Sequence, residues 1–159
     1  MKIQKIGPSD WQRLKVIRLD ALADAPDAFG STLNAETQSS DQNWKDRLVS
    51  QNVTTLIATI NQSDVGLAVG APYDDDAGLY SMWVAPSARG KGVADRLIAS
   101  VAHWAKERGH KQLLLDVADS NQAAINLYQR NGFEPTGVTS SLPPPRAHIK
   151  EHQRVLPLS

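Results

Sequence analysis

The stretch Leu79–Ala94 constrains this chain more than any other part of its sequence. It reads Leu-Tyr-Ser-Met-Trp-Val-Ala-Pro-Ser-Ala-Arg-Gly-Lys-Gly-Val-Ala and runs directly into the helical pattern Asp95–Arg108. An apolar strand therefore leads into a basic, glycine-rich turn that opens a helix. Glycines let a ligand approach the backbone, and the first turn of a helix presents unpaired N–H groups and the positive end of its dipole. The pattern predicts a binding site for a phosphorylated ligand, to which Arg89 and Lys91 add positive charge.

Length and composition limit the class of protein. A chain of 159 residues fits one domain of common size, so we expect a single domain over residues 1–159. Lys plus Arg and Asp plus Glu both number 17, and no long basic run occurs, so we expect no nucleic-acid partner. Cysteine is absent and the four histidines lack metal-ligand spacing, so we expect no metal. Neither a signal-peptide core nor a membrane-length apolar window is present, so we expect a cytoplasmic protein without a membrane partner.

The first fifty residues contain a predicted strand, two predicted helices and one segment without a clear pattern. The alternating stretch Lys2–Ile6 predicts a strand, and the apolar spacing over Trp11–Leu22 predicts a helix. Asp27–Ser39 has no clean period and is compatible with a loop or a short helix. A second helix is predicted over Gln42–Ser50, where Trp44 and Leu48 share one face.

Three strands precede the glycine-rich turn. Thr54–Ile60 and Val65–Ala71 are apolar or β-branched and flank a turn-forming Asn-Gln-Ser-Asp, which predicts a β-hairpin. The run Asp74–Asp76 lacks the spacing of a calcium-binding loop and predicts a solvated turn instead. Ala77–Val84 follows as the third strand.

The remaining elements complete a mixed α/β pattern. Gln112–Val117 contains three consecutive leucines, typical of a strand covered on both faces, and the strand–helix–strand crossover predicts that it runs parallel to Ala77–Val84. A further helix is capped by Ser120 or Asn121 and closed by Asn131-Gly132. Two final strands are predicted over Phe133–Ser140 and Ile149–Leu156. The order is β-α-α-β-β-β-α-β-α-β-β, an α/β fold whose sheet is partly antiparallel and partly parallel.

Three phosphate-binding patterns compete for the turn. A Walker P-loop requires two glycines separated by four residues and followed by Lys-Ser or Lys-Thr, which the chain lacks. The dinucleotide fingerprint is closer, because Gly90 and Gly92 follow a strand and Asp116 ends the next one. Asp95 at the third glycine position, and five residues between the strand and the first glycine, count against it. The third candidate is coenzyme A.

Two motifs resemble one family. Val84-x-Pro86-x-x-Arg89-Gly90-Lys91-Gly92-Val93-Ala94 is similar to the Arg/Gln-x-x-Gly-x-Gly/Ala signature of the GNAT superfamily of acetyltransferases. Asn121-x-x-Ala124-x-x-Leu127-Tyr128-x-x-x-Gly132-Phe133 resembles the second conserved block of that family. The motifs occur in the family's order with a strand and a helix between them. The resemblance covers Ala77–Glu134 by motif and the flanking arms by topology, and it implies the acyl-CoA N-acyltransferase (GNAT) fold.

The resemblance implies acetyl-CoA as cosubstrate. Backbone N–H groups from Arg89 to Ala94 would hold the pyrophosphate, in agreement with the argument from the helix terminus. The strand end at Met82–Val84 would pair with the pantetheine arm, and Asn121 would contact the cofactor. The implied cofactor-binding residues are Met82, Trp83, Val84, Arg89, Gly90, Lys91, Gly92, Val93, Ala94 and Asn121.

The resemblance also implies a mechanism of direct attack. A neutral primary amine of a small molecule or peptide would attack the acetyl carbonyl, the N–H of Val84 would stabilise the oxyanion, and Tyr128 would protonate the leaving thiolate as general acid. Family members often carry a carboxylate on the central strand to deprotonate the amine, but Tyr80 and Ser81 stand in that region here. The base is therefore a water chain, a residue such as Glu36, or solvent alone.

Alternatives remain at this stage for several residues and for the function. Tyr128 fits the apolar face of its helix as a core residue, and Asn121 fits a helix cap. A non-catalytic acyl-CoA-binding or sensing module is the alternative function, and a nucleotide-binding protein using Asp116 is a weaker one. A homodimer is an expectation from the family. The candidate acceptor-site residues are Phe29, Glu36, Trp44 and Ser81, of which Phe29 and Trp44 also fit the core.

Overall fold

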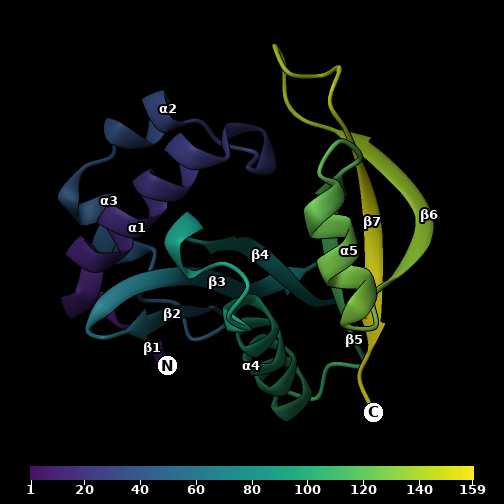
Figure 1. Ribbon diagram of the computed structural model, residues 1–159, viewed down its shortest axis with the longest axis horizontal. Helices are drawn as coiled ribbons and strands as arrows, with labels where there is room; N and C mark the ends of the chain where they lie inside the picture. The colour runs from purple at the N-terminus through teal and green to yellow at the C-terminus, as the bar shows by residue number, and fades with distance from the viewer.

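The computed structural model describes residues 1–159 and contains one seven-stranded sheet with the strand order β1-β2-β3-β4-β5-β7-β6 (Figure 1). β4 and β5 run parallel, and every other neighbouring pair is antiparallel. The predicted mixed sheet and the predicted parallel pair are therefore confirmed. The strands are β1 (Lys2–Lys5), β2 (Thr54–Ile60), β3 (Ser63–Tyr73), β4 (Asp76–Val84), β5 (Gln112–Ala118), β6 (Glu134–Ser141) and β7 (Lys150–Pro157).

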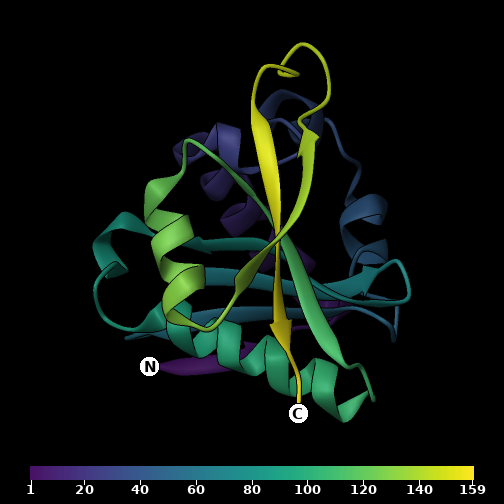
Figure 2. The same cartoon turned by 90° about the vertical axis from the view of Figure 1, so that its right-hand side faces the viewer.

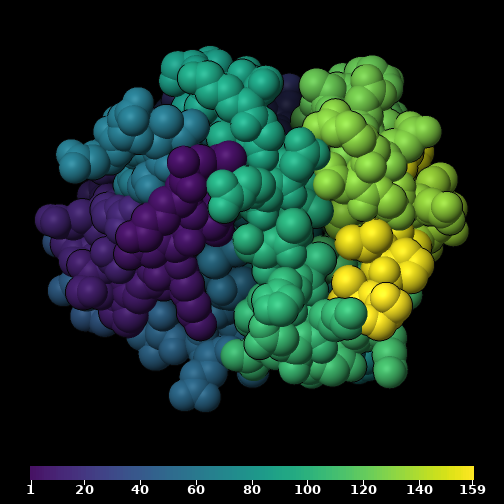
Figure 3. Space-filling model, turned by 60° about the horizontal axis from the view of Figure 1, so that its bottom comes forward, coloured from purple at the N-terminus to yellow at the C-terminus, as the bar shows by residue number.

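Five α-helices and three short 3-10 helices, η1 to η3, accompany the sheet. Their bounds are η1 (Pro8–Asp10), α1 (Trp11–Asp24), η2 (Pro26–Ala28), α2 (Leu33–Thr37), α3 (Asp41–Asp46), η3 (Pro86–Ala88), α4 (Val93–Glu107) and α5 (Gln122–Arg130). In the space-filling view, α4 crosses the middle of the molecule between the N-terminal strand and the C-terminal residues (Figure 3). No helix is long and apolar enough to cross a membrane.

The N-terminal arm contains the short helix that the sequence left open, and one of its predicted helices ends earlier than expected. Residues 27–39, which had no clean period, contain part of η2 and all of α2. The Thr32 hydroxyl accepts the Ala35 N–H, and this cap supports a helix too short to show a periodic pattern. The helix predicted over Gln42–Ser50 ends earlier, at Asp46, and single hydrogen-bonded turns continue to Val49.

The two apolar cores lie on opposite faces of the sheet. One lies beneath α4, whose Leu97, Ile98 and Val101 form a single buried stripe. The other lies beneath α1 and contains the fully buried Trp44 of α3. The two cores therefore hold the central strands in place from both faces of the sheet.

β4 and β5 diverge soon after they meet. Their ladder contains only the pairs Ala77–Leu113 and Gly78–Leu114, so β4 has no partner on the β5 side from Leu79 to Val84. Figure 1 shows the opening between the two strands, with α5 beside β5 and β7 and the N-terminal helices on the other side. The fold thus leaves an unpaired strand edge in the interior of its sheet.

Candidate active site

The unpaired edge of β4 contains a β-bulge. Tyr80 lies opposite Val69 and Trp83 opposite Leu67, so Ser81 and Met82 together face one residue of β3. Ser81 has a left-handed backbone with φ 57°, a conformation that residues other than glycine seldom adopt. The bulge changes the direction of β4 at the point where it has left β5.

The backbone of Val84 points into this opening. Ala85 donates its N–H to the carbonyl of Val65, so the neighbouring pair Val84–Gly66 is the kind that exchanges no hydrogen bonds across an antiparallel ladder. The N–H and carbonyl of Val84 are therefore directed away from β3. The carbonyl accepts Nε of Arg89 at 3.1 Å, and the N–H faces the side on which β5 is missing.

The glycine-rich turn has the backbone that its sequence predicts. Gly90 and Gly92 both have φ of 79°, and a Cβ added to either would meet no atom within 4 Å. Gly92 is the N-cap of α4, and the first hydrogen bond of the helix runs from the Arg96 N–H to the Gly92 carbonyl. The N–H groups of Val93 to Asp95 therefore have no acceptor within the helix. Open space and free donors occur at the same place, which suits a pyrophosphate.

A hollow of about 240 Å³ lies against this turn. Its lining includes Arg130 of α5, whose guanidinium contacts Asp95 at 3.0 Å. No local pattern indicated Arg130, because 35 residues separate it from Asp95. The hollow is lined by Val84, Ala88, Arg89, Gly90, Gly92, Val93, Ala94, Asp95 and Arg130.

Two residues of the predicted cofactor-binding set, Arg89 and Trp83, have side chains that bind another part of the chain. Arg89 contacts the Asp24 carboxylate at 2.6 Å, and Nε1 of Trp83 donates to the same oxygen at 2.9 Å. The Trp83 side chain is buried in the core beneath α1 and does not line the opening. These contacts lower the pKa of Asp24, the largest part coming from the Trp83 hydrogen bond. Asp24 thus ties the end of α1 to the end of β4.

The main cavity, of about 390 Å³, lies where β4 and β5 diverge. It collects residues from five separate parts of the chain, namely α1, the loop after it, the middle of β4, the end of β5 with α5, and β7. The lining residues are Arg18, Ala28, Phe29, Gly30, Ser31, Leu79, Tyr80, Ser81, Met82, Asp116, Val117, Ala118, Asn121, Ala124, Tyr128 and Glu151.

Tyr128 and Asn121 reach the cavity from α5. Tyr128 is 8% exposed, its ring packs edge-on against Phe133, and its hydroxyl makes no hydrogen bond within the chain. Burial raises the pKa of Tyr128, so its hydroxyl keeps its proton at neutral pH. Asn121 caps α5 by accepting the Ala124 N–H and also lines the cavity. The cap and a ligand contact are therefore compatible.

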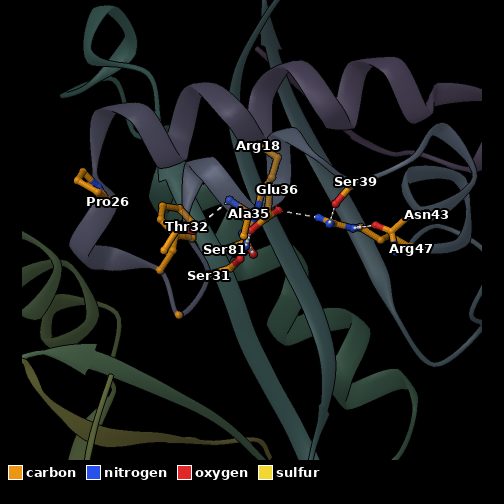
Figure 4. Close-up of polar contacts among 12 residues, drawn as sticks. Arg18, Pro26, Ser31, Thr32, Ala35, Glu36, Ser39, Asn43, Arg47 and Ser81 are labelled. Carbon is orange, nitrogen blue, oxygen red and sulfur yellow. Dashed lines mark hydrogen bonds and ion pairs between the residues drawn. The ribbon is translucent and has the colours of Figure 1, made fainter. Parts of the chain in front are cut away.

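A buried ion cluster contacts the bulge at Ser81 (Figure 4). Arg18 donates to both oxygens of Glu36, at 3.0 and 2.9 Å, and its Nη1 donates to Oγ of Ser81 at 2.6 Å. Arg47 donates to Glu36 from the other side at 2.7 Å. Burial raises the pKa of Glu36, but the two guanidinium groups more than offset this and bring it to about 2. Sequence reasoning missed Arg18, since nothing in the pattern of α1 sets it apart.

The four acceptor-site candidates separate into two groups. Phe29 and Ser81 line the cavity, and the Arg18 guanidinium lies 4.7 Å from the Phe29 ring centroid. Trp44 does not, because its side chain is completely buried beneath α1. Glu36 also lies outside the lining, and its low pKa and two arginine partners leave it no capacity to accept a proton near neutral pH.

Two carboxylates face the cavity from the strands on its other side. Asp116 of β5 accepts the Tyr73 hydroxyl at 3.0 Å. Glu151 of β7 has no hydrogen-bond or ion-pair partner, and burial followed by the charge of Asp116 raises its pKa. Sequence analysis placed Asp116 only in the dinucleotide alternative and missed Glu151, whose surroundings depend on the order of the sheet.

The loop between β6 and β7 is bound to the segment that follows α1. Arg146 donates from Nη1 to the carbonyls of Pro26 and Phe29, at 2.8 and 3.0 Å, and from Nη2 to those of Gly30 and Ser31, at 3.0 and 3.3 Å. Figure 2 shows this loop beyond the end of the sheet, on the side of the N-terminal helices. One guanidinium thereby joins two segments more than 110 residues apart.

The fold and the site define a protein with free N–H groups at the start of a helix and a cleft between diverging parallel strands. The family model described as "Acetyltransferase (GNAT) family" matches residues 19–133, and the chain belongs to this family. The expected GNAT fold is confirmed. The acetyltransferase of the GNAT family from Streptococcus pneumoniae has a TM-score of 0.83 and 20% identity, with 99% of each chain covered.

Curated relatives match over shorter regions. Streptothricin acetyltransferase of Streptomyces lavendulae is 39% identical over 100 residues, which cover 54% of this chain and 52% of that protein. Uncharacterized N-acetyltransferase YobR of Bacillus subtilis is 35% identical over 74 residues, which cover 46% of this chain and 30% of that protein. The chain therefore spans about half or less of the length of these relatives.

Proposed function

We propose that this protein is an acetyl-CoA-dependent N-acetyltransferase that acts on a primary amine of a small molecule or peptide by direct attack. The observation that carries the proposal is the meeting of two features at the end of β4. The open backbone edge of Leu79–Val84 continues into the free N–H groups at the start of α4. An extended arm ending in a pyrophosphate fits this continuous groove, and family membership supports acetyl-CoA as that ligand.

The binding roles follow from the geometry of the groove. The backbone from Gly90 to Ala94 would hold the pyrophosphate, with Lys91 and the helix dipole adding positive potential. Met82 and Val84 would pair with the extended arm through their backbone groups, since β5 leaves that edge unoccupied. Arg89 would act mainly by fixing the turn, because its guanidinium is engaged by Asp24 and the Val84 carbonyl.

The chemical roles fall to the Val84 N–H, beside the unpaired edge of β4, and to Tyr128 in the cavity. Acetyl-CoA supplies the thioester carbonyl that the amine attacks. The Val84 N–H would stabilise the oxyanion, because it points into the opening with no partner on β5. The Tyr128 hydroxyl, protonated and free of internal hydrogen bonds, would donate to the departing sulfur.

The test is an acceptor screen that measures release of free thiol from acetyl-CoA. The panel would include polyamines, amino sugars, free amino acids and peptides with open N-termini. Turnover of any member supports the proposal, and absence of both acetyl-CoA binding and turnover contradicts it. The Tyr128→Phe variant separates an enzyme from a sensing module. It should lower kcat by about 100-fold or more with little change in CoA affinity if Tyr128 is the acid.

Four further expectations belong to this proposal. Residues 1–159 would act as one domain, in the cytoplasm, without nucleic-acid or membrane partners, and as a homodimer. The sheet, which continues through both halves of the chain, supports the single domain. Sedimentation or elution volume measures the oligomeric state, and a monomer at micromolar concentration would contradict the dimer.

A further inference from the structure

Glu151 and Asp116 occupy diagonal positions on one face of the sheet. In the β5–β7 ladder, Asp116 lies opposite Gln153 and Ala118 lies opposite Glu151. Residues two apart on a strand point to the same side, so both carboxylates project toward the cavity from neighbouring strands. Diagonal neighbours of this kind are about 7–8 Å apart. The cavity therefore has an acidic wall on the side away from Arg18.

The two carboxylates differ in what they are free to do. Asp116 is exposed, and it accepts a hydrogen bond from Tyr73, whose hydroxyl in turn accepts one from Gln153. Glu151 is half-buried and has no partner within the chain. A half-buried carboxylate without a partner in the chain is free to accept a donor from a ligand in the cavity. Glu151 is thus the carboxylate on this side of the cavity that has no partner in the chain.

The charged groups around Glu151 leave room for one more cation. The Arg146 guanidinium lowers the pKa of Glu151, but its hydrogen bonds go to four backbone carbonyls. The Arg18 guanidinium on the opposite wall is bound to Glu36 and Ser81. The titratable or charged groups that surround the Glu151 side of the cavity are Arg18 on α1, Tyr80 on β4, Asp116 on β5, Tyr128 on α5 and Arg146 in the β6–β7 loop.

We propose that Glu151 binds the ammonium group of the acceptor and takes its proton, as the general base of the acetyl transfer. This inference rests on the proposed function and supplies the base that β4 lacks. Burial and the nearby Asp116 raise the pKa of Glu151, which makes it a better proton acceptor than a solvated glutamate. The same cavity holds Tyr128, so base and acid approach the reacting atoms from different elements.

Glu151 and Tyr128 together account for every proton that is transferred in the reaction. The ammonium group gives one proton to Glu151, and the neutral amine forms the new C–N bond. The C–S bond then breaks, and the thiolate takes the proton of the Tyr128 hydroxyl. The second proton lost from the amine nitrogen restores Tyr128, and Glu151 releases its proton to solvent.

Two amines of nearly equal size test the assignment. Ethylamine is protonated at neutral pH, whereas trifluoroethylamine is mostly neutral and needs no base. Glu151→Gln should lower kcat/KM for ethylamine by about 100-fold or more, yet leave that for trifluoroethylamine within about threefold of wild type. Raising the pH should restore the ethylamine rate of the variant, because free amine then forms in solution. The matched control is Glu134→Gln, which changes an exposed strand glutamate outside the cavity.

The outcomes separate the two proposals. Equal losses with both amines, or no loss with either, would overturn Glu151 as the base while leaving the transferase proposal intact. If wild type acetylates neither amine, the acceptor screen still decides the transferase proposal, and the ammonium site at Glu151 is tested by binding. Ammonium binding is then measured directly, by adding ethylammonium chloride to protein with carboxyl-labelled glutamate. The NMR resonance that is absent from Glu151→Gln should shift, and a resonance that stays in place would overturn the ammonium site as well.

Discussion

Nη1 of Arg18 donates a 2.6 Å hydrogen bond to Oγ of Ser81, the residue whose left-handed backbone forms the bulge in β4. A positive φ in a residue with a Cβ costs free energy and persists where surrounding contacts determine it. The same guanidinium is held by both oxygens of Glu36. The shape of the strand beside the cavity therefore depends on a side chain from α1, 63 residues earlier in the chain.

Arg18→Lys should destabilise the protein. Lysine keeps the charge, but it loses the planar fork that binds Glu36 and Ser81 at once, and Glu36 is nearly inaccessible. We expect the free energy of unfolding in urea to fall by about 2–3 kcal/mol. Arg13→Lys is the matched control, since its pair with Asp64 is more exposed and should cost less than about 1 kcal/mol. Equal losses in the two variants would contradict the prediction.

Glu36 should make the protein sensitive to acid. Its folded pKa of about 2 lies below the ordinary value of 4.5, so ionised Glu36 stabilises the folded state. This contribution is complete above pH 4.5 and is lost as the pH falls toward 2. Urea unfolding of wild type and Glu36→Gln across this range should therefore give stabilities that converge at low pH. A constant difference between the two proteins would show that Glu36 does not titrate in this way.

Gly92→Ala should destabilise the turn and weaken the binding of its ligand. A φ of 79° strains any residue with a Cβ, at a cost of about 1–2 kcal/mol, and the methyl group would occupy space beside the free N–H groups of α4. We expect a lower melting temperature and weaker binding of CoA by calorimetry. Gly7→Ala serves as control, because Gly7 is also in open space but has an extended backbone. Unchanged CoA affinity in Gly92→Ala would argue against the pyrophosphate site.

Arg146→Ala should loosen the segment of residues 26–31 without unfolding the sheet. The substitution removes four hydrogen bonds to backbone carbonyls of residues 26–31 and leaves the β6–β7 ladder intact. Limited proteolysis should cleave that segment at least about tenfold faster than in wild type. Arg96→Ala is the control, since the Arg96 side chain donates only to the carbonyl of Met1. Similar cleavage of both variants would contradict a clamping role for Arg146.

The elements of the fold could be predicted because their signals are local. The crossover from β4 through α4 to β5 shows a strand, a glycine turn and an amphipathic helix within a short stretch of sequence, and the structure confirms it. Trp44 shows the limit of this approach, because helical spacing identifies an apolar face without saying whether that face covers core or cavity. The catalytic roles of Val84 and Tyr128 stay predictions.

Residues brought together by topology had no comparable signal. Arg18 reaches Ser81 only because α1 packs beneath β4. Glu151 faces the cavity only because β7 inserts between β5 and β6. A sequence shows that a carboxylate is missing from the expected strand, but it does not show that a later strand brings one to the same cavity.

The ladder between β4 and β5 is the shortest in the sheet. On one side lie β1 to β4 with the N-terminal helices, and on the other lie β5 to β7 with α5, while two residue pairs form the ladder between them. A small rotation of one half against the other breaks few backbone hydrogen bonds along that seam. The apolar core beneath α4 joins the two halves across this seam, so a ligand that spans the seam adds backbone contacts where the ladder has only two pairs.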